Sequence, residues 1–216
     1  MNTLYPKPPH LTVAVWSGDD DRSTFARACE VAAEFGCTPT GASEDGPGVS
    51  KVGYRGKGLG TVIVEHLFGP DTEAHPVAIS LSAAALGWPE GMWTANDRKA
   101  AYKLAGWATD VLRELTARTG ALYGSIAVEE TLPTPSALRA GTPITSLPFL
   151  SAKLPPAALR TFQAAFPQTQ PIAWHHGTFF PGWRPFARAN PSTVDRTALR
   201  AASTALGNAL SRRNHE

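Results

Sequence analysis

The sequence predicts a single α+β domain, in which about four helices flank an antiparallel or mixed sheet of five to seven strands. In the first half, segments rich in β-branched residues alternate with short Gly/Pro links, which is typical of an antiparallel meander. A long amphipathic helix follows at about 95–118. Because no internal repeat or low-complexity linker interrupts the 216 residues, one domain is expected over 1–216, with 1–9 as a flexible N-terminus.

The chain opens with an expected strand at 11–17, where Val and Ala alternate, and continues with a helix at about 21–35. Apolar residues at helical spacing indicate this helix, and Gly36 suits a left-handed C-terminal cap. The next segment, "TPTGASEDGPGVS" at 38–50, consists of turn-forming residues without periodicity and is expected to be a loop. Three meander strands are expected after it, at about 50–55, 61–67 and 76–83.

The helix at about 95–118 is the clearest element of the sequence. Its apolar face is formed by Ala101, Leu104, Ala108, Val111 and Leu115. Thr94 with Asp97 three residues later resembles a capping box, and Gly120 lies where the helix should end. In the remaining chain we expect strands at 121–129, 147–151 and 171–180, helices at about 156–166 and 193–211, and a loop at 131–143.

The composition excludes several classes of function. The 20 basic and 18 acidic side chains give a formal net charge of +2, which is no electrostatic footprint for nucleic acid. No segment is apolar enough for a membrane span, the first residues do not resemble a signal peptide, and the two cysteines form no metal or disulfide pattern. A cytoplasmic protein without cofactor or metal is therefore expected, and assembly into a homo-oligomer stays open.

A glycine-rich turn, "RGKGLG" at 55–60, is the strongest short motif. Backbone N–H groups in such a turn bind pyrophosphate when a helix begins directly after it. Arg55, Gly58 and Gly60 resemble the acetyl-CoA turn of GNAT-type N-acetyltransferases, and "NDRKAAYKLAGW" at 96–107 is similar to a later stretch of that family. The resemblance implies acetyl-CoA as cofactor and Tyr102 as the general acid.

The residues after this turn favour a different structure. "TVIV" consists of four β-branched residues in a row, which stiffens the side chains and favours a strand over 61–67. The sequence therefore favours a glycine-rich hairpin turn with Arg55 and Lys57 in solvent at its tip.

Candidate catalytic residues do not assemble into a recognisable set. His175 and His176 are adjacent in an expected strand and would point to opposite faces, so one packed and one exposed histidine is expected. Cys29 lies on the apolar face of a helix, which favours a buried thiol over a nucleophile. An enzyme without a readable motif, centred on His175, His176 and Glu129, remains an alternative.

Glu65, His66 and His75 lie on neighbouring expected strands and are candidates to meet across a hairpin. Without a third ligand at diagnostic spacing, they do not predict a metal site.

Aromatic residues gather in the loops around 86–94 and 178–190, the second of which also carries arginines, and a partner surface is expected from these two loops together with the loop around 131–146. Trp, Met and Arg on loops of a rigid scaffold are typical of interface hot spots. The candidate partner-binding residues are Trp88, Trp93, Phe180, Trp183, Arg184 and Arg188. The alternative is that these rings close the ends of the core.

The order of elements along the whole chain resembles that of toxin-immunity proteins of polymorphic-toxin and type VI secretion systems. The resemblance rests on an opening strand that ends in Trp ("LTVAVWS"), a long helix leading into "GALYGSIAVEE", and a tail with "GTFFPGW", an Asn190–Pro191 turn and a closing helix. It implies a small cytoplasmic protein that binds a cognate toxin and blocks its active site, with no chemistry of its own.

Overall fold

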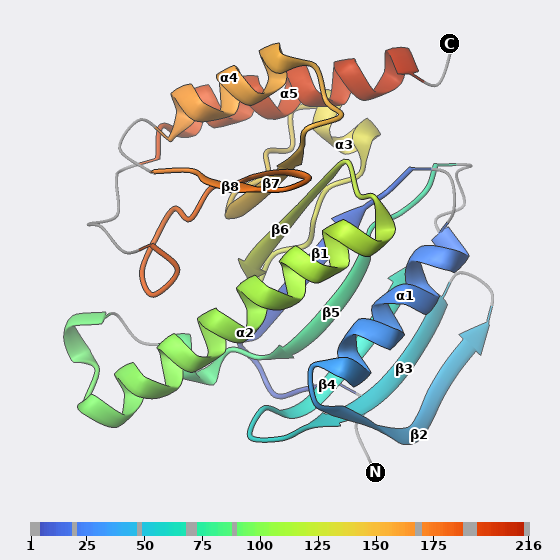
Figure 1. Cartoon of the computed structure of the whole chain (residues 1–216), viewed down its shortest axis with the longest axis vertical. Coiled ribbons are helices and arrows are strands. Elements are labelled where there is room, and N and C mark those ends of the chain that lie inside the picture. The colour runs from blue at the N-terminus through green and yellow to red at the C-terminus, as the bar shows by residue number, and fades with distance from the viewer. Residues whose placement is uncertain are drawn as a thin grey trace.

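One antiparallel sheet organises the chain, whose computed structural model describes residues 5–18, 21–46, 49–67, 73–87, 90–166, 170–187 and 194–213. The described sheet has nine strands in the order β2-β3-β4-β5-β1-β6-β7-β9-β8 (Figure 1). Their bounds are β1 His10–Trp16, β2 Cys37–Gly46, β3 Val49–Gly56, β4 Gly60–Leu67, β5 Val77–Ser82, β6 Tyr123–Val128, β7 Leu147–Ser151, β8 Ile172–Trp174 and β9 Gly177–Phe179. The prediction of one α+β domain is confirmed.

Helices cover both faces of this sheet. Their bounds are α1 Asp21–Glu34, α2 Ala95–Thr119, α3 Pro135–Arg139, α4 Pro156–Ala165 and α5 Arg196–Arg213, with single 3₁₀ turns η1 at Ala84–Leu86 and η2 at Glu90–Met92. On β1, Val13 and Val15 pack into a core cluster with α1 and α2, whereas Ala14 and Trp16 pack into a second cluster with α3, α4 and α5. The two cores therefore lie on opposite faces of β1, because successive side chains of a strand alternate.

The meander β3-β4-β5, the strand β7 and the helices α1, α2, α4 and α5 occur where the sequence predicts them, with ends shifted by a few residues. The strand count was too low, because the loop expected at 38–50 contains the edge strand β2. Its backbone pairs with β3 from Cys37 to Gly46, with a register shift between Pro39 and Ser43. An edge strand tolerates Pro and turn-forming residues because one of its edges needs no partner.

The single strand expected at 171–180 is a short hairpin instead. β8 and β9 pair with each other, and His175 and His176 form the turn between them. The expected loop at 131–143 contains α3, where the Thr134 hydroxyl accepts a hydrogen bond from the backbone N–H of Ala137. Helical periodicity cannot reveal an element of five residues, although Thr followed by Pro is a known start signal.

Residues 5–9 contact the first half of the sheet, and the expected flexibility of residues 1–9 stays a prediction. The Tyr5 hydroxyl donates to Glu65, Pro6 is buried, and the carbonyl of Pro9 accepts a hydrogen bond from Ala83. Residues 1–4 lie outside the described part of the chain.

The predicted caps of α2 are confirmed. Thr94 accepts from the backbone N–H of Asp97, and the Asp97 carboxylate accepts from the backbone N–H of Thr94 at 3.0 Å. Gly120 ends the helix in the left-handed conformation, with φ of 64°. Because this cap fixes where α2 begins, it also places the exposed first turns of the helix.

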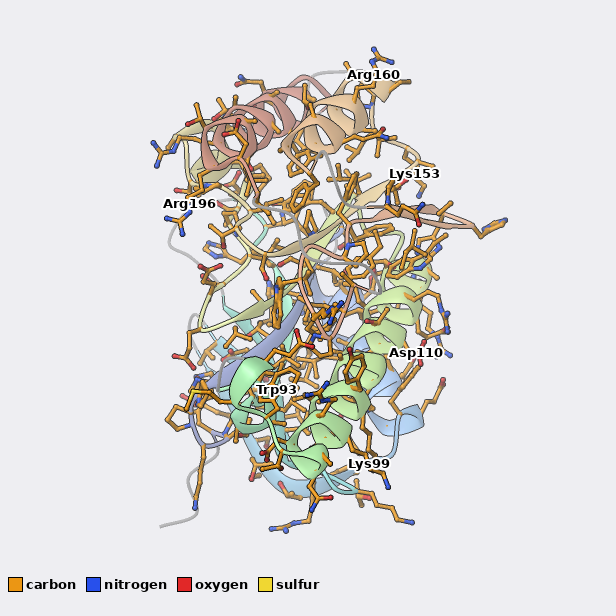
Figure 2. The ribbon with its side chains drawn as sticks, turned by 90° about the vertical axis from the view of Figure 1, so that its left-hand side faces the viewer. Trp93, Lys99, Asp110, Lys153, Arg160 and Arg196 are labelled. Carbon is orange, nitrogen blue, oxygen red and sulfur yellow. The ribbon has the colours of Figure 1, made fainter. Side chains whose placement is uncertain are left out.

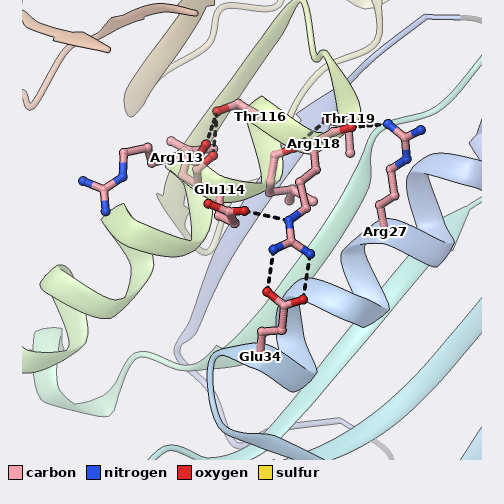
Figure 3. A network of polar contacts seen from close by, with 9 residues as sticks. Arg27, Glu34, Arg113, Glu114, Thr116, Arg118 and Thr119 are labelled. Atoms are coloured by element: carbon pink, nitrogen blue, oxygen red, sulfur yellow. Dashed lines mark hydrogen bonds and ion pairs between the residues drawn. The ribbon is translucent and has the colours of Figure 1, made fainter. Parts of the chain in front are cut away.

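An ion-pair network joins α1 to the last turns of α2 (Figure 3). The Arg118 guanidinium donates to both carboxylate oxygens of Glu34, at 2.8 and 2.5 Å, and through Nε to Glu114 at 2.6 Å. Arg27 of α1 donates to the backbone carbonyl of Arg118. The hydrogen bonds from Arg118 lower the pKa of Glu34.

Removing the N-terminal cap of α2 should destabilise the protein. Thr94→Ala is expected to cost about 1 kcal/mol, which lowers Tm by roughly 2–4 °C for a chain of this size. Thr109→Ala is the matched control, because Thr109 donates its hydroxyl to the Ala105 carbonyl inside the same helix and Ala is the better helix former. Thermal unfolding of the two variants tests this, and an equal loss in both would contradict a specific capping role.

Glu34→Gln should lower stability at neutral pH but not in acid. Because the folded-state pKa of Glu34 is lowered, its contribution is fully present above the unfolded pKa of about 4.3 and is lost as pH falls through the folded value. The Tm difference between wild type and Glu34→Gln should therefore shrink as the pH falls below about 4.3 and disappear below the lowered folded-state pKa. Glu30→Gln, an exposed position of α1 outside this network, serves as control.

Candidate functional site

The loops predicted to bind a partner are brought together in the structure. The Arg184 guanidinium forms an ion pair of 3.3 Å with Glu90, which joins the segment 181–187 to η2. The Trp183 indole N–H points to the Ser146 hydroxyl at 3.5 Å, which places the end of the 131–146 loop beside them. Three loops that are far apart in the sequence therefore contribute to one region of the surface.

Trp183 is largely structural in this region. Its ring meets that of Phe186 edge to face, with 4.8 Å between the ring centres, and both pack against the core cluster of α1 and α2. The alternative that such rings close the core is thus correct for the inner part of this loop. Arg184, which is half-buried, follows Trp183 at the surface.

Phe180 was predicted to contact a partner, and this prediction is wrong. Its side chain is 1% exposed and packs between Phe162 and Phe166 of the α4 region. The backbone N–H of Phe180 donates to the Pro148 carbonyl, which continues the pairing of β9 with β7 and turns the ring inward. Trp88 and Arg188 lie outside the described residues.

The most exposed apolar side chains of this region lie at the beginning of α2. Met92 is 66% exposed at the end of η2, and Tyr102 is 45% exposed on α2. Between them, Trp93 is half-buried and residues 95–100 are all exposed. Figure 1 shows that the first turns of α2 extend past the strands, and Figure 2 places Trp93 beside them. Met92 belongs to the aromatic loop that the sequence indicates at 86–94, but it is not among the six candidate partner-binding residues.

The glycine-rich motif forms the turn between β3 and β4. Gly56 pairs with Gly60, the Leu59 N–H donates to the Gly56 carbonyl at 3.1 Å, and Gly58 has a φ of 74°. The predicted strand after the turn is confirmed as β4. An acetyl-CoA turn of the GNAT kind requires a helix at this place, so the structure gives the acetyltransferase alternative less support than the motif alone.

Tyr102, the candidate acid of that alternative, projects into solvent from α2. The residue next to it, Lys103, approaches the turn instead: a Cβ placed on Gly58 would lie 3.6 Å from its Nζ. A hollow of about 460 Å³ separates the turn from α2, and Asn96, Lys99 and Lys103 line its helical side.

The two adjacent histidines behave as predicted, one packed and one exposed. His176 shares a hydrogen bond of 2.7 Å between Nε2 and the Thr116 hydroxyl, and its ring lies 5.2 Å from that of Phe149. Burial lowers the pKa of His176, and His175 is exposed at the turn. These contacts attach the β8–β9 hairpin to α2.

Glu129, which directly follows the last residue of β6, has a structural role. Its carboxylate accepts from the backbone N–H of His10 and lies 3.4 Å from the His10 ring nitrogen Nδ1. Glu129 adopts a φ of 58°, and its own N–H donates to the His10 carbonyl. These contacts close the β1–β6 ladder and do not include His175 or His176.

His66 and His75 lie near one another, as the sequence indicated. His66 is buried, and burial is the main cause that lowers its pKa, while His75 also acts on it. In the described ranges, no three His, Cys, Asp or Glu side chains are grouped so that they could hold a metal ion.

Both cysteines are surrounded by apolar side chains of the α1 side of the core. Burial raises the pKa of Cys29, and it raises that of Cys37 to about 11. The Tyr54 hydroxyl, whose pKa burial also raises, lies 3.5 Å from the Cys29 carbonyl. These thiols are therefore neutral at physiological pH.

Thiol reagents should react slowly with the folded protein. At pH 8, a pKa near 11 leaves roughly two hundredfold less thiolate on Cys37 than the usual value of about 8.5 would. Disulfide-exchange labelling of Cys29→Ser, which leaves Cys37 alone, should show this slow rate when folded and an ordinary rate in denaturant. A fast native reaction would contradict the buried, protonated state.

No model of a protein family, no curated protein and no solved structure matches this chain. None of the helices within the described ranges has the length and apolar character needed to cross a membrane. What the chain binds must therefore be inferred from its own residues.

Proposed function

We propose that this chain is a non-enzymatic protein-binding module of the immunity type, which neutralises a cognate toxin by direct binding in the cytoplasm. The observation that carries the proposal is the exposure of Met92 and Tyr102 at the beginning of α2, beside Trp93 and the Glu90–Arg184 pair. Met, aromatic residues and Arg are the residue types enriched in the cores of protein interfaces.

The energetics favour a binding role for these side chains. Burying an exposed Met side chain contributes about 1.5–3 kcal/mol to the free energy of binding, and burying an aromatic ring contributes a comparable amount. The surface is also held in place, because α2 is capped at Thr94 and packs on the core from Ala101 onward. A preorganised surface loses little conformational entropy when it binds, so more of the contact energy appears as affinity.

The toxin-immunity part of the proposal rests on the order of elements in the sequence, which resembles that of immunity proteins. Such a protein needs no catalytic set, because it acts by covering the active site of its partner. Glu129 and His176, the centre of the alternative enzyme reading, are engaged in contacts that join strands and helices, which supports a structural role for both.

Co-expression with the product of a neighbouring toxin-like gene tests the proposal. We expect the two proteins to co-purify and the chain to rescue growth. Met92→Ala and Tyr102→Ala together should weaken binding by at least about 2 kcal/mol, roughly thirtyfold in Kd. Ile172→Ala, which removes a side chain 42% exposed on β8, is the matched control and should leave Kd unchanged.

Two outcomes would overturn the proposal. One is a wild-type chain that neither binds nor rescues against the toxin-like neighbour. The other is binding that Ile172→Ala weakens as much as the α2 variant does, with unchanged Tm in both, because the recognition surface would then lie elsewhere.

A further inference from the structure

Four cationic side chains surround the tip of the β3–β4 hairpin: Arg55, Lys57, Lys99 and Lys103. Two hollows flank Gly58 at this tip. Lys99 and Lys103 line the hollow of about 460 Å³ on the α2 side, and Arg55 and Lys57 line one of about 710 Å³ on the β2 side. We call these four residues and the turn between them the basic hairpin surface.

The charge of this surface is not neutralised within the described chain. No Asp or Glu is among the residues that line either hollow, and none of the four cations forms an ion pair with another described residue. All four are exposed. Arg118 is different, because its guanidinium is held between two carboxylates. Because the whole chain has a formal net charge of only +2, the basic hairpin surface is a local concentration of positive charge.

Two rigid elements hold these cations in place. The hairpin turn is closed by the Gly56–Gly60 pair, and Gly58, which adopts a positive φ, has no side chain at its tip. Lys99 and Lys103 are four residues apart on α2 and therefore share one face of the helix. The Nζ of Lys103 reaches the turn, within 3.6 Å of the place where a Cβ of Gly58 would lie.

We propose that the basic hairpin surface binds an acidic segment of the partner protein, with carboxylates of that segment seated in the two hollows. This deepens the proposed function and rests on it, since Tyr102 is three residues after Lys99 on α2, so the two side chains are neighbours on the helix surface. Complementary charge would steer the encounter and set the orientation of the complex.

The observations favour an acidic protein over a nucleic acid. A protein that binds nucleic acid usually carries a positive potential over a whole face or groove, whereas this surface has four cations, two on one hairpin and two on α2. The adjoining surface presents the exposed thioether of Met92 and the ring of Tyr102, which suit the mixed apolar and charged surface of a protein.

The inference can be tested without the toxin, by fluorescence anisotropy with a labelled decaglutamate peptide at low ionic strength. The wild-type chain should bind it, and K99E with K103E should weaken binding by at least about tenfold. Glutamate near the start of a helix is compatible with folding, so the variant should keep its Tm. Arg160→Glu is the matched control and should bind like wild type, because Arg160 lies at the opposite end of the molecule from Lys99 (Figure 2).

The same binding measurement is repeated at increasing ionic strength and with competing anions. Binding should weaken steeply as ionic strength rises past about 0.1 M, where the Debye length is about 10 Å. The proposal is overturned if K99E with K103E binds the peptide as wild type does, or if Arg160→Glu loses as much. Tighter binding of a ten-nucleotide oligothymidylate or of acetyl-CoA at the same surface would likewise overturn it in favour of a phosphate ligand.

The same variants separate this inference from the proposed function. If the wild-type chain binds the toxin and K99E with K103E slows association, both proposals are supported. If toxin binding is unaffected by charge reversal, the acidic-segment inference fails and the immunity proposal survives. If the peptide binds at this surface but the toxin does not bind at all, the immunity proposal fails instead.

Discussion

The structure depends on the burial of β1 on both of its faces. The strand pairs with β5 on one side and β6 on the other, so its backbone hydrogen bonds are satisfied along most of its length. Its side chains divide between two cores, with Val13 and Val15 facing α1 and α2 and with Ala14 and Trp16 facing the C-terminal helices. Each helix layer therefore packs on a sheet that the other layer also stabilises.

This arrangement is compatible with the proposed binding surface on α2. From Ala101 to Thr116 the helix packs on the sheet, and at its far end Arg118 ties it to α1. Its first turns need no packing of their own because the cap at Thr94 and the anchored remainder hold them. Exposed apolar and cationic side chains on that end are thus displayed at low entropic cost, which is the property a binding protein requires.

Much of the secondary structure could be predicted from the sequence, because its signals are local. The capping box of α2, the glycine after it and the β-branched run after Gly60 each act within a few residues, and each prediction is confirmed. The predictions of secondary structure and exposure failed where contacts between residues far apart in the sequence determine the structure. β2 is a strand because it pairs with β3. Phe180 is buried because its backbone N–H bonds to Pro148 of β7, which continues the pairing of β9 with β7.

The same difference between local signals and long-range contacts applies to the candidate site. The sequence by itself determined which residue types are present: aromatic loops, a glycine-rich hairpin and an amphipathic helix with lysines four residues apart. Only the tertiary structure decided which of them meet. It joined η2 to the segment of Arg184, buried Phe180, and placed Lys103 against the hairpin turn. The physical reason is that exposure and proximity depend on sheet order and helix placement, which arise from contacts between residues far apart in the chain.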